Sequence, residues 1–103
     1  MESELPTREE IQLESVLHAL SDPQRLKVVR ALAADPTARP FGSFELNVSK
    51  STKTHHFRVL RESGLITQQA IGNCRMTALR REDLDARFPG LVDAVLTADR
   101  VPA

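Results

Sequence analysis

The first apolar pattern along the chain has the period of a helix. The repeat at i, i+3, i+4 and i+7 is formed by Leu13, Val16, Leu17 and Leu20. Because this spacing places the four side chains on one face, we predict a helix over residues 8–20. The preceding tail, residues 1–7, is polar and acidic and is expected to fray. His18 lies beside the apolar stripe, where a structural histidine is favoured over a metal ligand.

A second helix is predicted from Pro23 to about Ala33. Asp22 is a candidate N-cap, and proline fits the first helical position because its missing N–H would be unsatisfied there anyway. The side expected to be buried is formed by Leu26, Val29, Leu32 and Ala33. The side expected to face solvent is formed by Arg25, Lys27 and Arg30.

The stretch VSKSTKTHHFRVLRESG, residues 48–64, is predicted to be a long helix with both ends marked. Ser49 is placed to cap its N-terminus, and Gly64 is placed for the left-handed conformation that ends many helices. At about 100° per residue, one side is apolar and carries His56, Phe57 and Leu60. The other side has no carboxylate before Glu62; it carries Ser51, Thr54, His55 and Arg58, with Lys50 and Arg61 beside them.

The segment before this basic helix is too broken for a long helix. Pro36 ends the second helix, and Pro40 and Gly42 leave room only for a short helix around residues 43–46. A short helix, a tight turn and a long helix in succession form a helix-turn-helix, which we place at residues 42–64. The hydroxyls and cations of the long helix suit a polyanion whose base edges accept hydrogen bonds. We interpret it as a DNA recognition helix, with an ordinary solvated face as the alternative.

The pattern then changes from helical to alternating. Residues 65–71 are rich in β-branched side chains and glutamine, Gly72 and Asn73 are turn residues, and residues 74–79 alternate again. These features predict a β-hairpin over residues 65–79. A helix-turn-helix followed by a hairpin is a winged helix, so the expected fold is mainly α with a small β-hairpin wing.

The turn of the hairpin carries the remaining candidate DNA contacts. Asn73 and Arg75 stand where a wing can touch phosphate or enter the minor groove, although an ordinary exposed hairpin tip would look the same. Cys74 is expected to be a small buried strand residue with a packing role. The predicted DNA-binding set is Lys50, Ser51, Lys53, Thr54, His55, Arg58, Arg61, Asn73 and Arg75.

The C-terminal part, residues 81–98, is predicted to be helical but broken, because Pro89 disfavours helical geometry at the residue before it. Its apolar repeat, together with the first helix, exceeds what one small unit needs to cover. We therefore expect a homodimer whose two recognition helices lie about one DNA turn (~34 Å) apart. The predicted interface, between the terminal helices at residues 8–20 and 81–98, consists of Leu13, Val16, Leu17, Leu20, Leu91, Val92 and Val95.

Composition supports a single DNA-binding domain. The 103 residues fit one domain, residues 1–103. Lys plus Arg (14) equals Asp plus Glu (14), but acids dominate before residue 23 and cations dominate between residues 39 and 75. The middle of the chain is therefore a basic patch. One cysteine excludes an internal disulfide, and no apolar run of about 18 residues or signal-like leader is present, so we expect a cytoplasmic protein without a membrane span.

Neither catalysis nor metal binding has support in the sequence. No Ser/His/Asp order, glycine-rich phosphate loop or paired-carboxylate pocket is visible, so no enzymatic function or cofactor is predicted. His55 and His56 are adjacent, so their side chains diverge by about 100° on a helix. A transition-metal site needs three or four converging ligands, which only a site between subunits would supply here. The competing function is a protein-interaction module, but such a surface favours exposed aromatics and Met, which the basic face lacks.

Two segments carry a family resemblance. LHALSDPQRLKVVRALA (residues 17–33) and SKSTKTHHFRVLRESGLI (residues 49–66), followed by a hairpin and a helix, resemble the ArsR/SmtB family of bacterial winged-helix repressors. The resemblance spans roughly residues 13–97. It implies a homodimer with terminal helices at the interface, which binds palindromic operator DNA and usually releases it on a chemical signal. The family's recognition-helix contacts correspond to Ser51, Thr54, His55 and Arg58.

The sequence departs from this family at the positions that sense metals. The family's sensors commonly place cysteines before the recognition helix or His and acidic ligands on the last helix, but residues 37–49 contain no Cys and residues 81–103 contain no His. Lys53 stands where the family usually has an aliphatic residue, so it is expected either to loosen the start of the recognition helix or to extend the basic face. We therefore predict a homodimeric repressor without the usual metal ligands and with its effector open.

Overall fold

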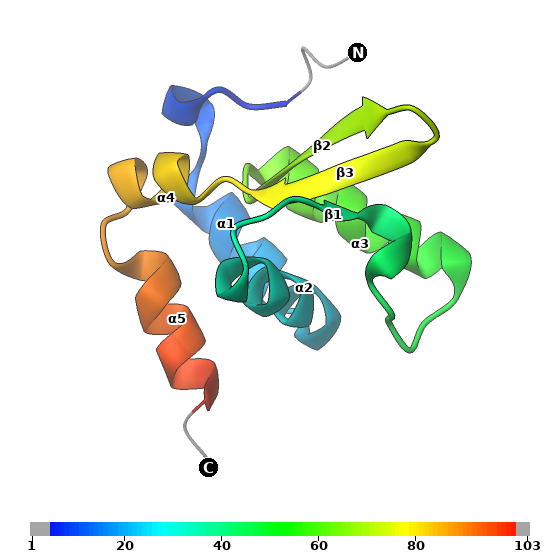
Figure 1. Ribbon diagram of the computed structural model, residues 1–103. Coiled ribbons are helices and arrows are strands. Elements are labelled where there is room, and N and C mark those ends of the chain that lie inside the picture. Colours follow the sequence, from blue (N-terminus) through cyan, green and yellow to red (C-terminus); the bar gives the residue numbers. More distant parts are fainter. Residues whose placement is uncertain (1–4, 101–103) are drawn as a thin grey trace.

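The computed structural model describes residues 5–100 as helices packed around a small antiparallel sheet (Figure 1). In chain order the elements are a 3₁₀ turn (Arg8–Glu10), α1 (Leu13–Leu20), α2 (Pro23–Ala34), β1 (Arg39–Pro40), a 3₁₀ turn (Phe41–Ser43), α3 (Lys50–Ser63), β2 (Ile66–Ile71), β3 (Cys74–Leu79), α4 (Arg81–Arg87) and α5 (Leu91–Arg100). The strands lie in the order β1-β3-β2 and pair antiparallel. This confirms the predicted winged helix-turn-helix fold.

The ends of α2 and α3 form as the sequence predicted. Asp22 Oδ1 accepts hydrogen bonds from the backbone N–H groups of Gln24 (2.8 Å) and Arg25 (3.2 Å). Ser49 Oγ caps α3 by accepting from the backbone N–H of Thr52 at 3.2 Å. Gly64 ends α3 with φ of 92°, which favours glycine. A Cβ at Gly64 would also lie 2.7 Å from Ile11 Cγ1, so the helix end and the segment before α1 touch directly.

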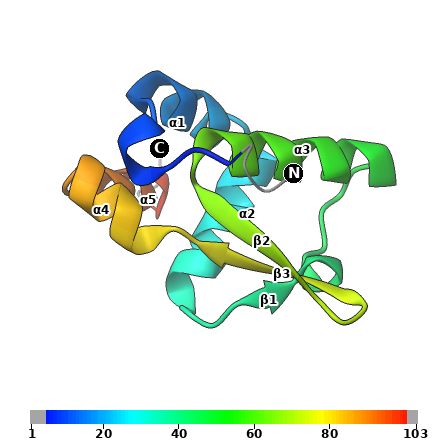
Figure 2. The same cartoon turned by 90° about the horizontal axis from the view of Figure 1, so that it is seen from above.

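One apolar core joins every helix to the sheet. Its most deeply buried members include Val16, Val29, Phe57, Leu60, Ile66, Leu84 and Val92, each no more than 1% exposed. Each such side chain contributes about 1.5 to 3 kcal/mol when buried. Because α3 supplies Phe57 and Leu60, its inner side is fixed and its outer side points in a defined direction. The N-terminal end of α3 and the tip of the β2–β3 hairpin lie at the same side of the molecule, and α4 and α5 lie at the opposite side (Figure 2).

The predicted helix over residues 8–20 is interrupted. A 3₁₀ turn at Arg8–Glu10 is followed by extended backbone at Ile11, and α1 begins only at Leu13. Ile11 is 1% exposed and packs against Gly64, so core burial outweighs the continuation of the helix. Of the predicted frayed tail, residues 1–4 lie outside the described residues. Pro6 is held in place, since its carbonyl accepts a hydrogen bond from Arg80 Nη1 at 2.7 Å.

The predicted short helix around residues 43–46 is wrong. A 3₁₀ turn at Phe41–Ser43 takes its place, and β1 before it pairs with β3, which the sequence analysis did not predict. The rings of Phe41 and Phe44 pack on Phe57 of α3 with centroid distances of 4.8 and 5.2 Å. Aromatic packing therefore holds this segment against α3 in place of a regular helix.

The predicted dimer-interface residues divide into two groups. Val16, Leu20 and Val92 are 0–8% exposed in the chain's own core, so for these three the prediction of an interface position is corrected. The first apolar stripe is wider than the core needs, and the side chains it leaves outside are Leu13 (43% exposed) and Leu17 (45% exposed). Leu91 and Val95 of α5 are half-buried. No helix in the described part of the chain is long and apolar enough to cross a membrane.

Candidate nucleic-acid interface

The outer side of α3 is open and polar. Ser51, Thr54, His55 and Arg58 are all exposed, as is Lys50 at the helix start. These are the positions that the helical period selected, and the buried side chains of α3 lie on the opposite side. The face presents hydroxyls, an imidazole and a guanidinium without a carboxylate among them, which suits contacts to phosphates and base edges.

A cationic hollow lies between α3 and the hairpin. Its volume is about 450 Å³, and it is lined by Phe41, Thr54, Phe57, Arg58, Arg61, Gln68 and Arg75. The fold thus brings Arg75 of β3 to the same space as two arginines of α3. None of these three arginines has an ion pair with any residue between 5 and 100. The phenylalanine walls lower the local dielectric, which strengthens the attraction of the guanidinium groups for an anion.

Two of the predicted DNA contacts have structural partners. Lys53 Nζ donates to the carbonyl of Phe44 at 2.6 Å and lies 4.4 Å from the centroid of the Phe41 ring. Lys53 is half-buried and connects α3 to the preceding segment. It therefore neither loosens the start of the helix nor extends the basic face, which were the two expected outcomes. Arg61 Nη1 donates to Gln68 Oε1 at 2.8 Å, which links α3 to β2 while leaving its other donors available.

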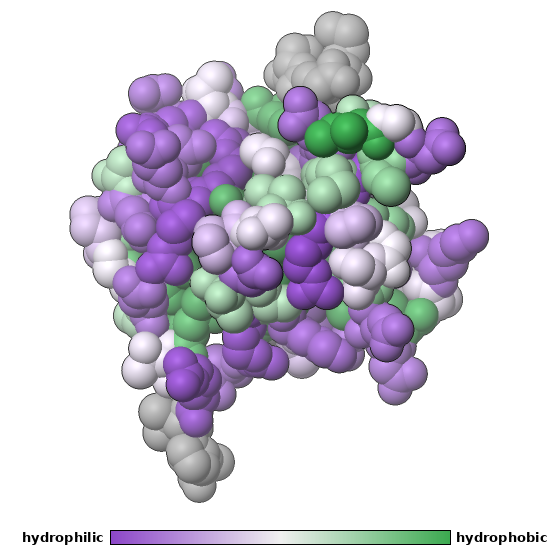
Figure 3. All heavy atoms as spheres, viewed as in Figure 1, coloured by the Kyte–Doolittle hydropathy of each residue, from purple (hydrophilic) through white to green (hydrophobic). Residues whose placement is uncertain are grey.

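The tip of the hairpin is exposed. Asn73, Cys74 and Arg75 all face solvent, and Gly72 makes the turn with φ of 61°. The expected burial of Cys74 is wrong, because its position in β3 lies beyond the part of the hairpin that packs on the core. Figure 3 shows apolar residues gathered over the hairpin, where Ile71 is 56% exposed.

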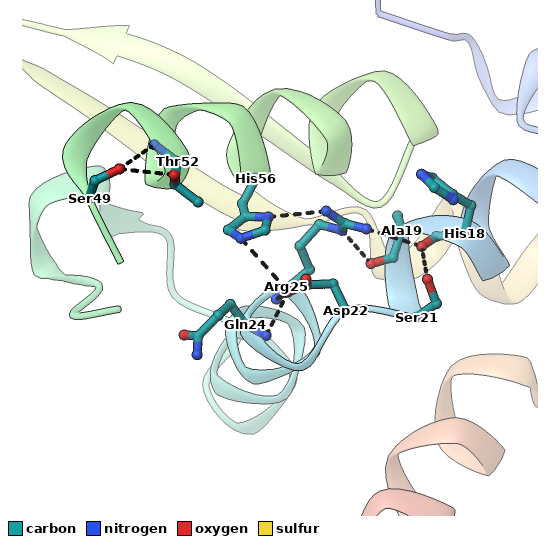
Figure 4. Close-up of polar contacts among 9 residues, drawn as sticks. All are labelled: His18, Ala19, Ser21, Asp22, Gln24, Arg25, Ser49, Thr52 and His56. Carbon is teal, nitrogen blue, oxygen red and sulfur yellow. Dashed lines mark hydrogen bonds and ion pairs between the residues drawn. The ribbon is translucent and has the colours of Figure 1, made fainter. Parts of the chain in front are cut away.

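A buried polar network lies beneath α3 and was missed by the sequence analysis, which placed Arg25 in solvent (Figure 4). Arg25 is only 7% exposed, and its guanidinium reaches His56 Nδ1 at 3.0 Å. Its Nε donates to the carbonyl of Ala19 at 2.8 Å, and its Nη2 donates to that of His18 at 3.3 Å. One side chain of α2 thus connects the C-terminal turn of α1 to α3.

Asp22 borders the same network. Burial opposes ionisation of its carboxyl group, but the backbone N–H groups of Arg25 and Gln24 outweigh it, and the pKa of Asp22 lies below its ordinary value. The carboxylate therefore stays charged at neutral pH, with Oδ1 located 3.8 Å from His56 Nε2.

Comparisons with known proteins agree with this geometry. A family model described as bacterial regulatory protein, arsR family, matches residues 22–68. An arsenical resistance operon repressor from Staphylococcus xylosus is 30% identical over 89 residues, which cover 86% of this chain and 85% of that protein. The chain belongs to the arsR family. The predicted resemblance is therefore confirmed.

A second relative and a solved structure support the assignment. The uncharacterized HTH-type transcriptional regulator YceK of Bacillus subtilis (strain 168) is 28% identical over 82 residues, or 78% of this chain and 82% of that protein. The crystal structure of the transcriptional repressor BigR from Xylella fastidiosa superposes with a TM-score of 0.67 at 25% identity, covering 93% of this chain and 99% of that one. As an ArsR-family member, the protein is a DNA-binding transcriptional regulator and not an enzyme.

Metal-ligating side chains do not gather in the part of this ArsR-family chain that the structure describes. Within residues 5–100, no group of three or more His, Cys, Asp or Glu residues is placed to hold a metal ion. His55 is exposed whereas His56 is buried, and their ring centroids are 6.1 Å apart. The two imidazoles therefore lie in different environments, one in solvent and one in the interior.

Proposed function

We propose that this ArsR-family regulator is a homodimeric repressor that binds palindromic operator DNA through the outer face of α3 and the hairpin tip. The observation that carries the proposal is the convergence of Arg58, Arg61 and Arg75 on one hollow beside the open face of α3. No carboxylate of residues 5–100 lines the hollow, so its three guanidinium groups suit the backbone phosphates that flank the major groove.

The predicted DNA contacts have different proposed roles. Thr54, His55 and Arg58 stand on the exposed face of α3 and are assigned to base edges or phosphates, with Lys50 and Ser51 at the helix N-terminus assigned to phosphate. Asn73 and Arg75 are assigned to the wing contact. Lys53 is removed from the contacting set, because its ammonium group already donates to Phe44.

The proposed dimer would be formed by the apolar surface that the single chain leaves uncovered. Leu13 and Leu17 are exposed on α1, and Leu91 and Val95 remain half-buried on α5. A second copy related by a two-fold axis would cover both sets at once. It would also explain a palindromic operator, because each recognition helix would read one half-site.

DNA binding is tested by fluorescence anisotropy with a labelled duplex that contains the region upstream of the gene encoding this protein. Arg58→Ala should weaken binding about tenfold or more, because it removes a base or phosphate contact. Arg100→Ala, which removes an exposed arginine of α5, is the matched control and should leave the affinity unchanged. Equal affinities of the wild type and Arg58→Ala at two salt concentrations would refute the proposed face.

The proposed dimer is tested by sedimentation at micromolar concentration. Leu17→Glu should convert the dimer to a monomer and abolish binding to a full operator, since one half-site loses its contacts. Ile71→Glu, at the hairpin, is the control for the sedimentation measurement alone, because Ile71 is equally apolar and more exposed but lies away from the terminal helices. A wild-type monomer that binds DNA tightly would contradict the proposal.

We further propose that transition metals do not change the affinity for the operator; the effector, if there is one, stays open. Affinity for the upstream duplex should be the same with a chelator as with modest excess zinc, nickel or copper. A tenfold loss with one metal, about 1.4 kcal/mol of coupling, would reveal a site shared between subunits. His18, Cys74 and the N-terminal glutamates would then be the first residues to substitute.

A further inference from the structure

Arg25 of α2 is hydrogen-bonded to His56 of α3 (Figure 4). Within residues 5–100, no other side-chain hydrogen bond joins α3 to α1 or α2. Both residues are 7% exposed. The guanidinium also donates to two carbonyl oxygens in the last turn of α1, those of His18 and Ala19. A single hydrogen-bonded group therefore joins α1, α2 and α3.

The chemistry of this contact assigns the role of one nitrogen of the imidazole. A guanidinium group has only donors, so His56 Nδ1, which lies 3.0 Å from Arg25 Nη1, must be the acceptor. The proton of the neutral ring is then on Nε2, on the side of Asp22. A second proton on Nδ1 would point directly at the guanidinium N–H and remove the hydrogen bond.

Loss of this hydrogen bond would be transmitted to the outer face of α3. A buried guanidinium that loses an acceptor is costly, so Arg25 and His56 would separate. His56 is adjacent in sequence to His55 and Phe57, and the same helix carries Thr54 and Arg58 on its outer side. A small rotation or shift of α3 would therefore displace the DNA-reading side chains from their productive positions.

We propose that Arg25 and His56 are positioning residues for the recognition helix, and that they hold it in the DNA-reading orientation only while the imidazole is neutral. Acid would therefore weaken operator binding. The proposal rests on the DNA-binding face proposed above. It adds a regulatory property that neither the family membership nor the relatives supply.

The charged groups around His56 favour this direction. Arg25 and Asp22 face the ring from α2, His55 lies on the same helix with its ring centroid 6.1 Å away, and α1 contributes only carbonyl oxygens to the network. Asp22 attracts an imidazolium, but at 3.8 Å it is beyond hydrogen-bond distance, and its Oδ1 already accepts two backbone N–H groups. The guanidinium, at 3.0 Å, is the nearer charge.

Two substitutions of His56 separate the acceptor from the ring. His56→Asn places an oxygen acceptor, which does not titrate, at the same bond distance from the backbone as Nδ1. His56→Gln instead extends its amide toward the position of Nε2 and supplies no acceptor to Arg25. All proteins carry His55→Gln, because an exposed imidazole on the DNA face would bind phosphate more strongly in acid and mask the effect.

The affinity of each protein for the labelled upstream duplex is measured at about pH 8 and about pH 5.5, which bracket the ordinary range of imidazole titration. The protein with His56 should lose about fivefold or more of its affinity in acid. His56→Asn should bind nearly as well at pH 8 and change less than about twofold, and His56→Gln should bind weakly at both values. Equal pH dependence of the His56 and His56→Asn proteins, or stronger binding in acid, would overturn the proposal.

A measurement without DNA tests the same contact. Amide exchange protection of α3 should fall in acid for the His56 protein and stay constant for His56→Asn, while β2 and β3 remain protected in both. Unchanged protection of α3 in acid in the His56 protein would overturn the proposal. Protection of β2 and β3 in His56→Asn shows that the substituted protein is folded. Arg58→Ala separates the two hypotheses. If Arg58→Ala leaves the affinity for DNA unchanged, the proposed DNA-binding face is wrong. If Arg58→Ala weakens binding but the His56 and His56→Asn proteins show the same pH dependence, only the positioning role of His56 is refuted.

Discussion

Two populations of arginines in this protein differ in their partners. Around the N- and C-terminal helices they are paired with aspartates, in the contacts Arg8–Asp83, Arg80–Asp83, Arg81–Asp85, Arg81–Asp93 and Arg30–Asp99. Around α3 and the hairpin, the three arginines of the hollow have no such pair in residues 5–100. A net charge of zero therefore describes two opposite situations, since one set is neutralised within the fold and the other is left for an external anion.

The paired population has a measurable electrostatic signature. The hydrogen bond from Arg8, followed by that from Arg80, holds the pKa of Asp83 below its ordinary value against the effect of burial. In turn, hydrogen bonding to Asp93 raises the pKa of Arg81. These charges connect α4 to the N-terminal segment and to α5, so they act on the fold and not on a ligand.

The largest expected effect concerns salt and the unpaired population. If both copies of a dimer use the three arginines on phosphates, raising salt from about 50 to about 200 mM should reduce affinity for the upstream duplex about a thousandfold. The triple variant Arg58→Ala/Arg61→Ala/Arg75→Ala should show a much shallower slope of log affinity against log salt. Asp83→Asn should keep the wild-type slope, and a triple variant with that slope would break the comparison.

Acid should lower stability through two aspartates, Asp83 of the paired population and Asp22 at the start of α2. Asp22 and Asp83 both have a pKa below the ordinary value of about 3.9, so the stability they supply is present above that value and is lost as pH falls through the folded pKa. The urea midpoint of unfolding should therefore decrease below about pH 4. The double variant Asp22→Asn/Asp83→Asn should be less stable at neutral pH but flatter in acid; an equally steep acid loss in that variant would exclude these two groups as its source.

Asp83→Asn alone should have a smaller effect, confined to stability. It weakens the hydrogen bonds from Arg8 (2.7 Å) and Arg80 (2.9 Å), and because Arg8 is partly exposed we expect a loss of about 1 kcal/mol in the free energy of unfolding. Chemical denaturation measures the change. DNA affinity of the folded protein should be unaffected, and a parallel loss of affinity would mean that the two populations are coupled.

The smallest expected effect separates two lysines of α3. Lys53→Met should lower the free energy of unfolding by about 0.5 to 1 kcal/mol, because it removes the hydrogen bond to Phe44 while keeping the alkyl chain. Lys50→Met should leave stability unchanged and reduce the salt slope by about one. Thermal unfolding measures the stability of both variants, and anisotropy titrations measure their salt slopes. A loss of stability in Lys50→Met, or a reduced salt slope in Lys53→Met, would contradict these assignments.

Features marked by local sequence were predictable from sequence alone. The cap at Ser49, the left-handed end at Gly64 and the turn at Gly72 depend on residues within a few positions of each other, and all three form as predicted. The open face of α3 follows from its period in the same way. The winged-helix fold could therefore be predicted without a structure.

Features that depend on distant partners were not predictable in this way. Arg25 looks like a solvent residue on its own helix, and only the packing of α3, 31 positions later, supplies the acceptor that makes its burial possible. Ile11 interrupts the first helix because of its contact with Gly64. Lys53 likewise finds a carbonyl oxygen nine residues earlier in a segment whose path is set by aromatic packing.

The exposure of Cys74 has a practical consequence. It is the only cysteine of the chain, and it lies in the open at the end of the hairpin. A thiol-reactive fluorophore or spin label would therefore attach at one known position without any engineered cysteine. In an assembly of two copies, the labels would report a single distance between the hairpin tips, which could be followed in solution as DNA is added.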